Sequence, residues 1–361
     1  MSSKIIFIRK RAKLIIRNDI KDLTKNELII WLQDHGIQSF RAGQIFKWIY
    51  LRQADTFDIM TDIGKTTREL LSSHFIIERL SIMKTEQSAD GSKKYLFQLQ
   101  DGNHIETVLI PEKNHQTLCI STQVGCAQNC KFCLTAKGGF VRNLTAGEIL
   151  AQVRDVKNTL DHPEQLKNIV LMGMGEPLAN YDNVIKALDT MRDADHGLKI
   201  SARKITISTA GLIHQFSALG RDTDVNLAIS LNATDNKTRS MLMPINRKYP
   251  IEDLIKACRK YPLAPREKIT FEYILIQGVN DSPADADRLI KLLRSVKSKI
   301  NLIPFNEHPE SELKRPDDQV IDAFLQKLHD AGYTAIIRHS KGQDISAACG
   351  QLRANQIRKQ E

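Results

Sequence analysis

Short apolar runs alternate with amphipathic segments along the last two thirds of the chain. Apolar runs bounded by turn residues predict strands, and segments with apolar positions three or four residues apart, such as TAGEILAQVRDVKNTL, predict helices. The strand-like runs are LCIST, NIVLMGMG, KITIST, VNLAISL, KITFEYILI and KINLIPFN, with a late seventh in TAIIRHS. Alternation of this kind indicates an α/β protein, with a parallel sheet covered by helices. Six strand–helix units fall short of the eight that close a standard barrel, so we expect a partial, open (β/α)6 barrel.

The N-terminal quarter has the pattern of helices instead. In LTKNELIIWLQDHG, Thr24 and Glu27 form a capping box at the start of a helix that Gly36 ends. The segments RAGQIFKWIYLRQ and GKTTRELLSSHF predict two more short helices. The period then changes, and KKYLFQLQDGNHIETVLIP alternates around Asp101 and Gly102, which indicates a β-hairpin.

These patterns divide the chain into four parts. We expect a small helical accessory domain, a β-hairpin extension or linker, a core barrel with a C-terminal loop, and a short tail. Their expected bounds are 1–90, 91–115, 116–349 and 350–361.

Charge adds a candidate partner. The chain of 361 residues has a net charge of +10 and a pI of about 9.2, which favours a polyanionic partner such as nucleic acid. A solubilising surface is the alternative, and charge alone does not separate the two. The basic residues that precede the first acid are Lys4, Arg9, Lys10, Arg11, Lys13 and Arg17.

The pattern also bears on location. No apolar run approaches the roughly 20 residues that span a bilayer. The first apolar run is too short for a secretory signal, while a transit peptide is a weaker alternative for this basic segment. We therefore expect a cytoplasmic protein without membrane association.

Six cysteines are present, and three of them form a CxxxCxxC unit: Cys126, Cys130 and Cys133. Their clustering argues against disulfide staples and favours metal binding. Three thiolates suit an iron–sulfur cluster or zinc, but structural zinc takes four ligands. The nearby candidates for a fourth ligand are His104, His115 and Cys119. Three ligands would instead leave one cluster iron open, which is a catalytic arrangement.

Further polar residues follow the later strands. Ligands in parallel α/β folds gather where strands end, so we expect these residues at one rim. In GMGEP the glycines allow close approach of a ligand, and Glu176 could bind an amine, although a turn that requires positive φ explains the same glycines. The other strand-end candidates are Ser208, Ser230, Asn232 and Asn306. Cys349, in Ala-Ala-Cys-Gly, is either exposed or a small buried residue.

Together these motifs resemble a known family. CxxxCxxC after a first strand and GMGEP after a second are similar to the radical SAM superfamily. TLCISTQVGC, MGMGEPLANYDNV, MPINRKYP, GVNDS, NLIPFN and DISAACGQL resemble the RlmN/Cfr family of RNA adenosine methyltransferases. The resemblance extends over nearly the whole chain, and Cys119 together with AACGQ is its most family-specific part.

The resemblance implies a mechanism. The CxxxCxxC cysteines would hold a [4Fe–4S] cluster whose open iron chelates S-adenosyl-L-methionine (SAM). One SAM would methylate Cys349, and a second would yield a 5′-deoxyadenosyl radical that takes hydrogen from the S-methyl group. The carbon radical would add to C2 of an adenine, with Glu106 as proton acceptor. Cys119 would then attack the sulfur of Cys349, forming a transient disulfide and releasing methylated RNA.

The resemblance also implies a SAM site and a product. Many relatives have His where this chain has Asn232, and Asn cannot titrate, so no acid–base role is carried over to that position. Pro177 stands where Cfr proteins typically have Ala, which favours C2 methylation over the C8 methylation of the Cfr type. The SAM site would be lined by Gly175, Glu176, Ser208, Ser230, Leu231, Asn232 and Asn306.

The implied partners are RNA and a reductant. The family acts on adenosine 2503 of 23S rRNA and adenosine 37 of some tRNAs, and the N-terminal domain would supply phosphate contacts. An electron donor such as flavodoxin or ferredoxin and a monomeric state are also expected. Two alternatives are a radical SAM enzyme with another substrate and a non-catalytic iron–sulfur or zinc RNA-binding module. The pair Cys119 and Cys349 argues against the first, and the GMGEP turn argues against the second.

Overall fold

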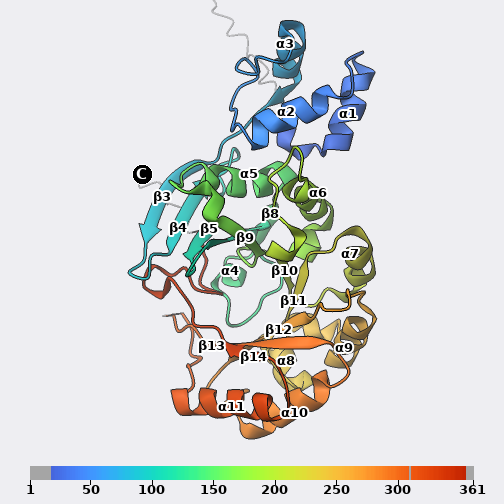
Figure 1. The fold of residues 1–361 in the computed structure, drawn as a ribbon. Coiled ribbons are helices and arrows are strands. Elements are labelled where there is room, and N and C mark those ends of the chain that lie inside the picture. Colours follow the sequence, from blue (N-terminus) through green and yellow to red (C-terminus); the bar gives the residue numbers. More distant parts are fainter. Residues whose placement is uncertain (1–17, 309, 355–361) are drawn as a thin grey trace, which may run out of the picture.

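A ten-stranded sheet forms the centre of the protein (Figure 1). The computed structural model describes residues 18–308 and 310–354. The strand order is β14-β13-β12-β11-β10-β9-β6-β5-β4-β3. Neighbours from β6 to β14 are parallel, and those from β3 to β6 are antiparallel. The strands are β3 (Ser81–Gln87), β4 (Lys93–Gln98), β5 (His104–Pro111), β6 (Gln116–Cys119), β9 (Leu166–Leu171), β10 (Ile205–Thr209), β11 (Asn226–Ser230), β12 (Ile269–Leu275), β13 (Ser298–Pro304) and β14 (Ala335–Ile337).

The parallel part is the expected open barrel. All six predicted strands and the late seventh lie in it in chain order, and β14 and β3 are the two edges, so the sheet does not close. The central strands β11 and β12 are buried along most of their length, as parallel strands covered on both faces are. The seven-residue antiparallel strand β3 was not expected and lies in the range predicted to be helical.

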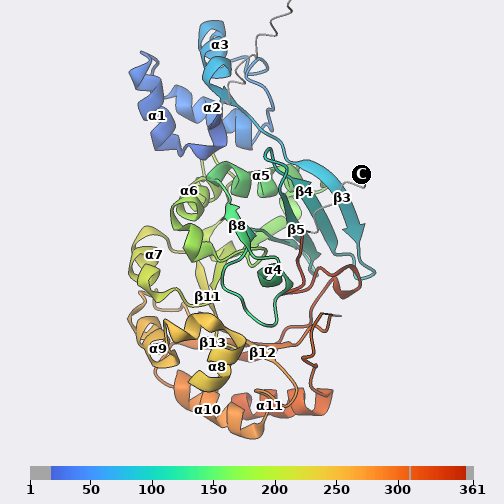
Figure 2. The ribbon, with the colours of Figure 1, turned by 180° about the vertical axis from the view of Figure 1, so that it is seen from behind.

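Helices cover the parallel strands on the outside (Figure 2). Helix α5 (Ala146–Lys157) begins with the predicted capping box. Thr145 Oγ1 accepts from the Glu148 backbone N–H, and the Glu148 carboxylate accepts from the Thr145 backbone N–H. The short helix α8 (Asn236–Leu242) was not expected. The other covering helices are α6 (Tyr181–Arg192), α7 (Phe216–Asp222), α9 (Ile251–Lys260), α10 (Pro283–Leu293) and α11 (Asp318–Asp330). No helix in the described ranges is long and apolar enough to cross a bilayer.

A small helical domain lies beyond α5 and α6 (Figure 1). It contains the three predicted helices, α1 (Lys25–Asp34), α2 (Arg41–Tyr50) and α3 (Lys65–His74). The capping box of Thr24 and Glu27 is present at the start of α1, as predicted. A parallel pair of two-residue strands, β1 (Asn18–Asp19) and β2 (Phe75–Ile76), joins the two ends of the domain.

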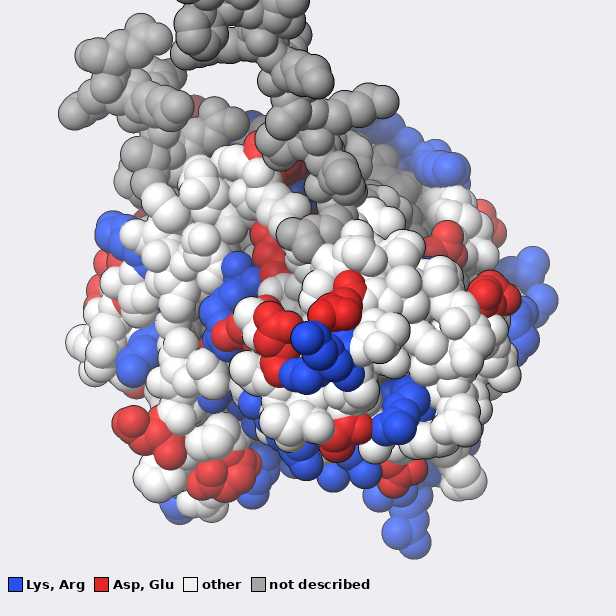
Figure 3. Space-filling view, turned by 90° about the horizontal axis from the view of Figure 1, so that it is seen from above, with Lys and Arg blue, Asp and Glu red and all other residues white. Residues whose placement is uncertain are grey.

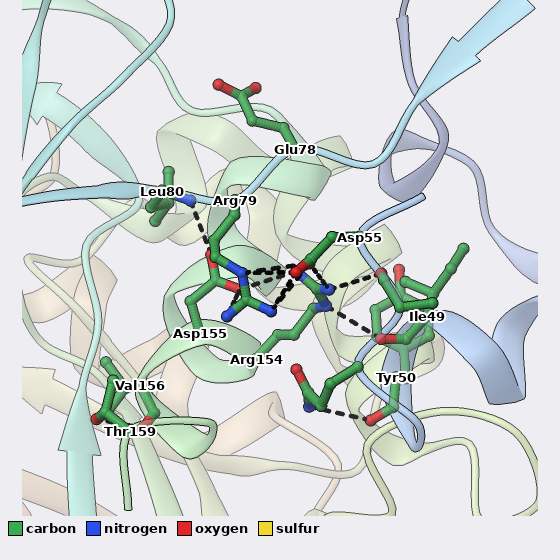
Figure 4. Close-up of polar contacts among 12 residues, drawn as sticks. Ile49, Tyr50, Asp55, Glu78, Arg79, Leu80, Arg154, Asp155, Val156 and Thr159 are labelled. Carbon is green, nitrogen blue, oxygen red and sulfur yellow. Dashed lines mark hydrogen bonds and ion pairs between the residues drawn. The ribbon is translucent and has the colours of Figure 1, made fainter. Parts of the chain in front are cut away.

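A buried arginine attaches this domain to the barrel (Figure 4). Arg154 on α5 is fully buried and donates hydrogen bonds to the backbone oxygens of Ile49 and Ala54 at 3.0 and 2.7 Å. It also donates to Asp55 at 2.6 Å and to Asp155 at 2.9 Å. Ile49 lies in the last turn of α2, where backbone oxygens lack partners within the helix. The guanidinium of the barrel domain therefore supplies the hydrogen bond that the C-terminal end of α2 in the helical domain lacks.

The helical domain itself is not basic. Figure 3 shows Lys and Arg interspersed with Asp and Glu on the face seen from above. The cationic residues in 18–77 are Lys21, Lys25, Arg41, Lys47, Arg52, Lys65 and Arg68, and the acidic ones are Asp19, Asp22, Glu27, Asp34, Asp55, Asp58, Asp62 and Glu69. Seven cations against eight acids give a net charge of −1. The expected basic character thus belongs to residues 1–17, which lie outside the described residues.

The predicted hairpin is formed by β4 and β5. Its loop contains three residues, because the backbone N–H of Leu99 donates to the oxygen of Asn103 at 2.8 Å. Gly102 ends the loop with φ +82°, the left-handed conformation that glycine adopts without strain.

Candidate active site

A cavity of about 140 Å³ lies at the carboxyl ends of the parallel strands. It is lined by loops that follow β9, β10 and β11, by the cysteine loop and by the C-terminal loop. The structure thus brings most of the predicted residues to one place. The lining includes Cys126, Cys130, Cys133, Gly173, Gly175, Glu176, Ser208, Ser230, Asn232, Glu272 and Cys349.

The cysteine loop and a short helix lie between two paired strands. The strands are β7 (Gln123–Gly125) and β8 (Phe140–Asn143), and the helix is α4 (Leu134–Lys137). The Cys126 backbone N–H donates to the oxygen of Gly139 at 2.8 Å, which closes the loop at its base. Burial raises the pKa of the Cys126 thiol to about 12, and a bound cation would favour its thiolate form.

The spacing of the thiols distinguishes the possible metals. In the described part of the chain, only Asp193, Asp195 and His196 place three potential ligand atoms within 4.8 Å of one another. At least one pair of the three cysteine sulfurs therefore lies more than 4.8 Å apart. A single zinc ion, with Zn–S bonds of about 2.3 Å, would bring its sulfurs to about 3.8 Å. The wider spacing and the all-thiol donor set fit an iron–sulfur cluster, whose irons each take a separate thiolate.

The GMGEP turn requires its glycines. Gly175 has φ +108°, and a Cβ there would lie 2.6 Å from Gln123 Cβ. A Cβ on Gly173 would lie 2.7 Å from the backbone oxygen of Ile120. The turn therefore packs directly against the segment that leads from β6 into the cysteine loop. The positive φ of Gly175 agrees with the turn interpretation of these glycines, while close approach of a ligand stays a prediction.

The Glu176 carboxylate lines the cavity and is already engaged. Its oxygens accept from the backbone N–H groups of Leu178 at 3.1 Å and Ala210 at 2.7 Å. Burial nevertheless raises the pKa of Glu176 to about 7. The carboxylate thus joins the turn after β9 to the turn after β10, and a ligand amine would add to these contacts.

Asn232 occupies a position that favours its side chain. Its φ is +56°, a left-handed conformation that Asn tolerates better than most residues. Its amide oxygen accepts from the Ile274 backbone N–H at 2.9 Å, and its nitrogen lies 3.3 Å from the sulfur of Met243. The neighbouring Leu231 is fully buried and does not line the cavity, while Ser208 Oγ donates to Glu272 at 3.1 Å.

Arg239 holds the strand ends in place. This buried side chain donates to the backbone oxygens of Leu231, Ala210 and Ser230 at 3.1, 2.8 and 3.2 Å. It thereby fixes the loops after β10 and β11 against each other. The sequence signal for it was weak, because an isolated Arg in a polar helix has the pattern of a solvated residue.

A second, smaller cavity of about 60 Å³ is lined by two further cysteines. Its lining includes Cys119 at the end of β6, Cys349, Cys133 and Arg338. Both Cys119 and Cys349 are free thiols. Burial raises the pKa of Cys119 to about 12. The upstream cysteine thus lies beside the C-terminal cysteine, although 230 positions separate them in the sequence.

The C-terminal loop is held at several points. Asn306 donates to the backbone oxygen of Cys349 at 3.2 Å and accepts from Gln343 at 3.0 Å. The backbone N–H of Leu134, on α4, donates to the oxygen of Gly350 at 2.7 Å, and Figure 2 shows this segment beside α4. Asn306 was expected at the SAM site, but it does not line the larger cavity and instead positions the loop.

Glu106 lies on β5 and is buried beside the same loop. One oxygen accepts from the Arg353 backbone N–H at 2.7 Å, and the other lies 3.4 Å from Lys94 Nζ. Burial raises the pKa of Glu106, while the Lys94 cation opposes this effect. Lys94 also donates to the oxygen of Ile345 at 2.6 Å, so it connects Glu106 to the loop that carries Cys349.

Comparison with known proteins agrees with this geometry. Residues 18–77 match the Ribosomal RNA large subunit methyltransferase N-terminal domain, and residues 120–292 match the Radical SAM superfamily. A radical SAM methyltransferase crystal structure from Sphaerobacter thermophilus is 44% identical, with a TM-score of 0.87 over 93% of this chain and 99% of that chain.

Two curated relatives named "Dual-specificity RNA methyltransferase RlmN" cover nearly the whole chain. The protein of Desulfosudis oleivorans is 62% identical over 93% of this chain and 91% of its own length. That of Geobacter sulfurreducens is 53% identical over 93% of this chain and 92% of its own length. The superfamily match implies a [4Fe–4S] cluster and SAM. The chain is therefore an enzyme that belongs to the RlmN family of radical SAM RNA methyltransferases.

Proposed function

We propose that this enzyme methylates C2 of adenosine in both 23S rRNA and tRNA, through a methylated cysteine and a transient disulfide. The observation that carries the proposal is the small cavity in which Cys119 and Cys349 lie together beside Cys133 of the cysteine loop. Two free thiols in one cavity are the arrangement that a resolving reaction requires. The dual specificity is carried over from the names of the relatives.

The larger cavity would hold the cofactors. Cys126, Cys130 and Cys133 would ligate the cluster, and Glu176, Ser208, Ser230 and Asn232 would contact SAM. When bound, the cluster and SAM supply the methyl group and the radical that activates it. Two molecules of SAM per turnover and a flavodoxin- or ferredoxin-type reductant belong to the proposal, as do a monomeric state and a cytoplasmic location.

The chain's own residues divide the remaining work. Cys349 would carry the methyl group, since it lines both cavities and therefore faces both the SAM site and Cys119. Glu106 would accept a proton from the adenine, because it is a buried carboxylate fixed by the backbone of Arg353, four residues after Cys349. Lys94 would keep Glu106 ionised and hold the loop.

RNA contacts would come from more than one surface. Strand β8, which follows α4, exposes Phe140 and Val141 beside the cysteine loop, with 47% and 54% of their surfaces accessible. Exposed aromatic and apolar side chains are suited to stacking against unpaired bases. The basic residues of 1–17 would supply phosphate contacts, since the helical domain has no cationic excess.

Cys119→Ala tests the proposal. The variant should form the methylated cysteine and the bond to RNA but should not release it, so RNA stays attached through a methylene bridge. A denaturing gel of protein expressed in cells, with and without ribonuclease, should show an RNA-dependent upward shift. Cys258→Ala is the matched control, because Cys258 is a buried free thiol on α9 that lines neither cavity.

The outcomes are distinct. A shift in Cys119→Ala that disappears when Cys349 is also replaced supports the resolving role. A clean band with normal RNA methylation would exclude it. Mass spectrometry of rRNA and tRNA after reaction identifies the modified adenosines, and 8-methyladenosine in place of 2-methyladenosine would instead support the Cfr-type reaction.

A further inference from the structure

Arg338 lies beside the two cysteines of the small cavity and has no assigned role. It directly follows β14, and its backbone N–H donates to the oxygen of Leu302 at 2.8 Å, which fixes its main chain against β13. Its side chain lines the cavity that Cys119 and Cys349 share.

The guanidinium lacks a close anionic partner. Across the described residues, no carboxylate oxygen lies within 4.0 Å of it, and its one side-chain hydrogen bond is a weak contact of 3.9 Å to the sulfur of Met172. Arg338 is partly buried, and a guanidinium that loses part of its hydration normally has a paired anion. The groups that raise the pKa of Arg338 are Cys349 first, and then Glu272, Cys119 and Glu112.

The thiol of Cys119 needs such a cation. Thiol–disulfide chemistry proceeds through the thiolate, and burial strongly disfavours a thiolate at this position. The neighbouring groups act in opposite directions: Cys349 and Glu272 raise the pKa of Cys119, while Arg338 and the backbone N–H of Met172 lower it. Arg338 is the cation that acts most strongly on this thiol.

We infer that Arg338 is a positioning residue for product release, which stabilises the thiolate of Cys119 for attack on the sulfur of Cys349. The inference rests on the proposed function. In this step an S–S bond forms, the bond from the Cys349 sulfur to the methylene carbon breaks, and its electron pair stays on that carbon. The carbon takes a proton from water and becomes the methyl group. The two sulfurs are oxidised to a disulfide, and the carbon is reduced by the same two electrons.

The test measures thiolate formation without turnover. The protein with its cluster bound, kept anaerobic and free of SAM, carries Cys349→Ser so that Cys119 is the reactive thiol. Methyl methanethiosulfonate, a small thiol reagent, is added between about pH 7 and 9, and the modified Cys119 peptide is quantified by mass spectrometry. Because an adjacent cation lowers a pKa by about one unit or more, Arg338→Met should slow modification about tenfold at each pH.

Two variants separate charge from packing. Arg338→Lys keeps the cation and should react within about twofold of the parent, whereas Arg338→Gln should be as slow as Arg338→Met. Arg192→Met is the matched control. Arg192 is a partly buried arginine on α6 that pairs with Asp224 at 2.7 Å and lines neither cavity, so its loss should leave the rate unchanged.

The inference is overturned if Arg338→Met modifies Cys119 at the parent rate, or if Arg338→Lys is as slow as Arg338→Met. Arg338→Gln replaces Arg338→Met if the latter does not fold. A failure of the proposed function appears elsewhere, as the absence of an RNA adduct in Cys119→Ala, and does not alter the modification rates. If both hold, Arg338→Met with Cys119 intact should accumulate the RNA adduct during turnover.

Discussion

Replacing Arg154 by Met should loosen the attachment of the helical domain. The guanidinium and Asp155 form a buried pair, with side chains 0% and 3% exposed. The backbone oxygens of Ile49 and Ala54 also depend on this one donor group (Figure 4). Met preserves much of the aliphatic volume, so the change removes mainly the charge and the hydrogen bonds.

The expected cost is about 3 kcal/mol in the free energy of unfolding. Breaking a buried ion pair from one side typically costs about 3 to 5 kcal/mol, because the remaining charge is left without compensation. The lower end applies here, since Asp155 retains a hydrogen bond from the Leu80 backbone N–H at 2.8 Å and an ion pair with Arg79 at 3.7 Å. Burial already raises the pKa of Asp155, so its protonation at lower pH should reduce the loss.

Urea denaturation followed by circular dichroism measures the effect, with Arg79→Met as the matched control. Arg79 binds the same two acids, but its side chain is 33% exposed, and its loss should cost no more than about 1 kcal/mol. Limited proteolysis should cut Arg154→Met between the helical domain and the barrel before it cuts the parent protein. Equal stabilities of the two arginine variants would refute the reasoning.

Three other results are expected. Replacing Cys126, Cys130 or Cys133 by Ala should abolish iron binding and turnover while the fold remains. Iron analysis and circular dichroism measure these effects, and a full iron complement would contradict the ligand assignment. Lys94→Met should shift the acid limb of the methylation pH–rate profile to higher pH. Glu106 accepts a proton only when it is ionised, and the Lys94 cation lowers the pKa of Glu106 that burial raises. An unchanged acid limb would contradict this role of Lys94. If about six phosphates are contacted, RNA affinity measured by binding titration should fall roughly 10³-fold between about 50 and 200 mM salt. Deletion of residues 1–17 should weaken the affinity. A flat salt dependence would mean that the charge only aids solubility.

The features that local sequence specifies were predictable. A capping box requires only a Thr and a Glu three residues apart, so the starts of α1 and α5 could be read directly. The alternation of apolar runs and amphipathic segments specified the parallel strands, their order along the chain and the open barrel. The parallel topology then placed the strand-end residues at one rim, because every such strand ends on the same side.

Contacts between distant segments were decided only by the tertiary structure. The sequence suggested a turn at Asp101 and Gly102, but a two-residue loop would shift the register by one and turn Lys94 away from Glu106. The actual three-residue loop pairs Lys94 with Val108, diagonal to Glu106 and on the same face. Side chains along a strand alternate between the two faces of the sheet. One residue more or less in the loop therefore decides which face a side chain of the paired strand occupies.

The remaining determinants are single side chains without a repeating pattern. Arg154 and Arg338 look like ordinary polar residues, and their environments arise only when a domain packs on α5 and a C-terminal loop folds back to β6. The sequence by itself determined which chemistry the cysteines could perform, because a close spacing of thiols is a local property. Only the fold decided which cation faces Cys119, because that depends on two segments more than 200 residues apart.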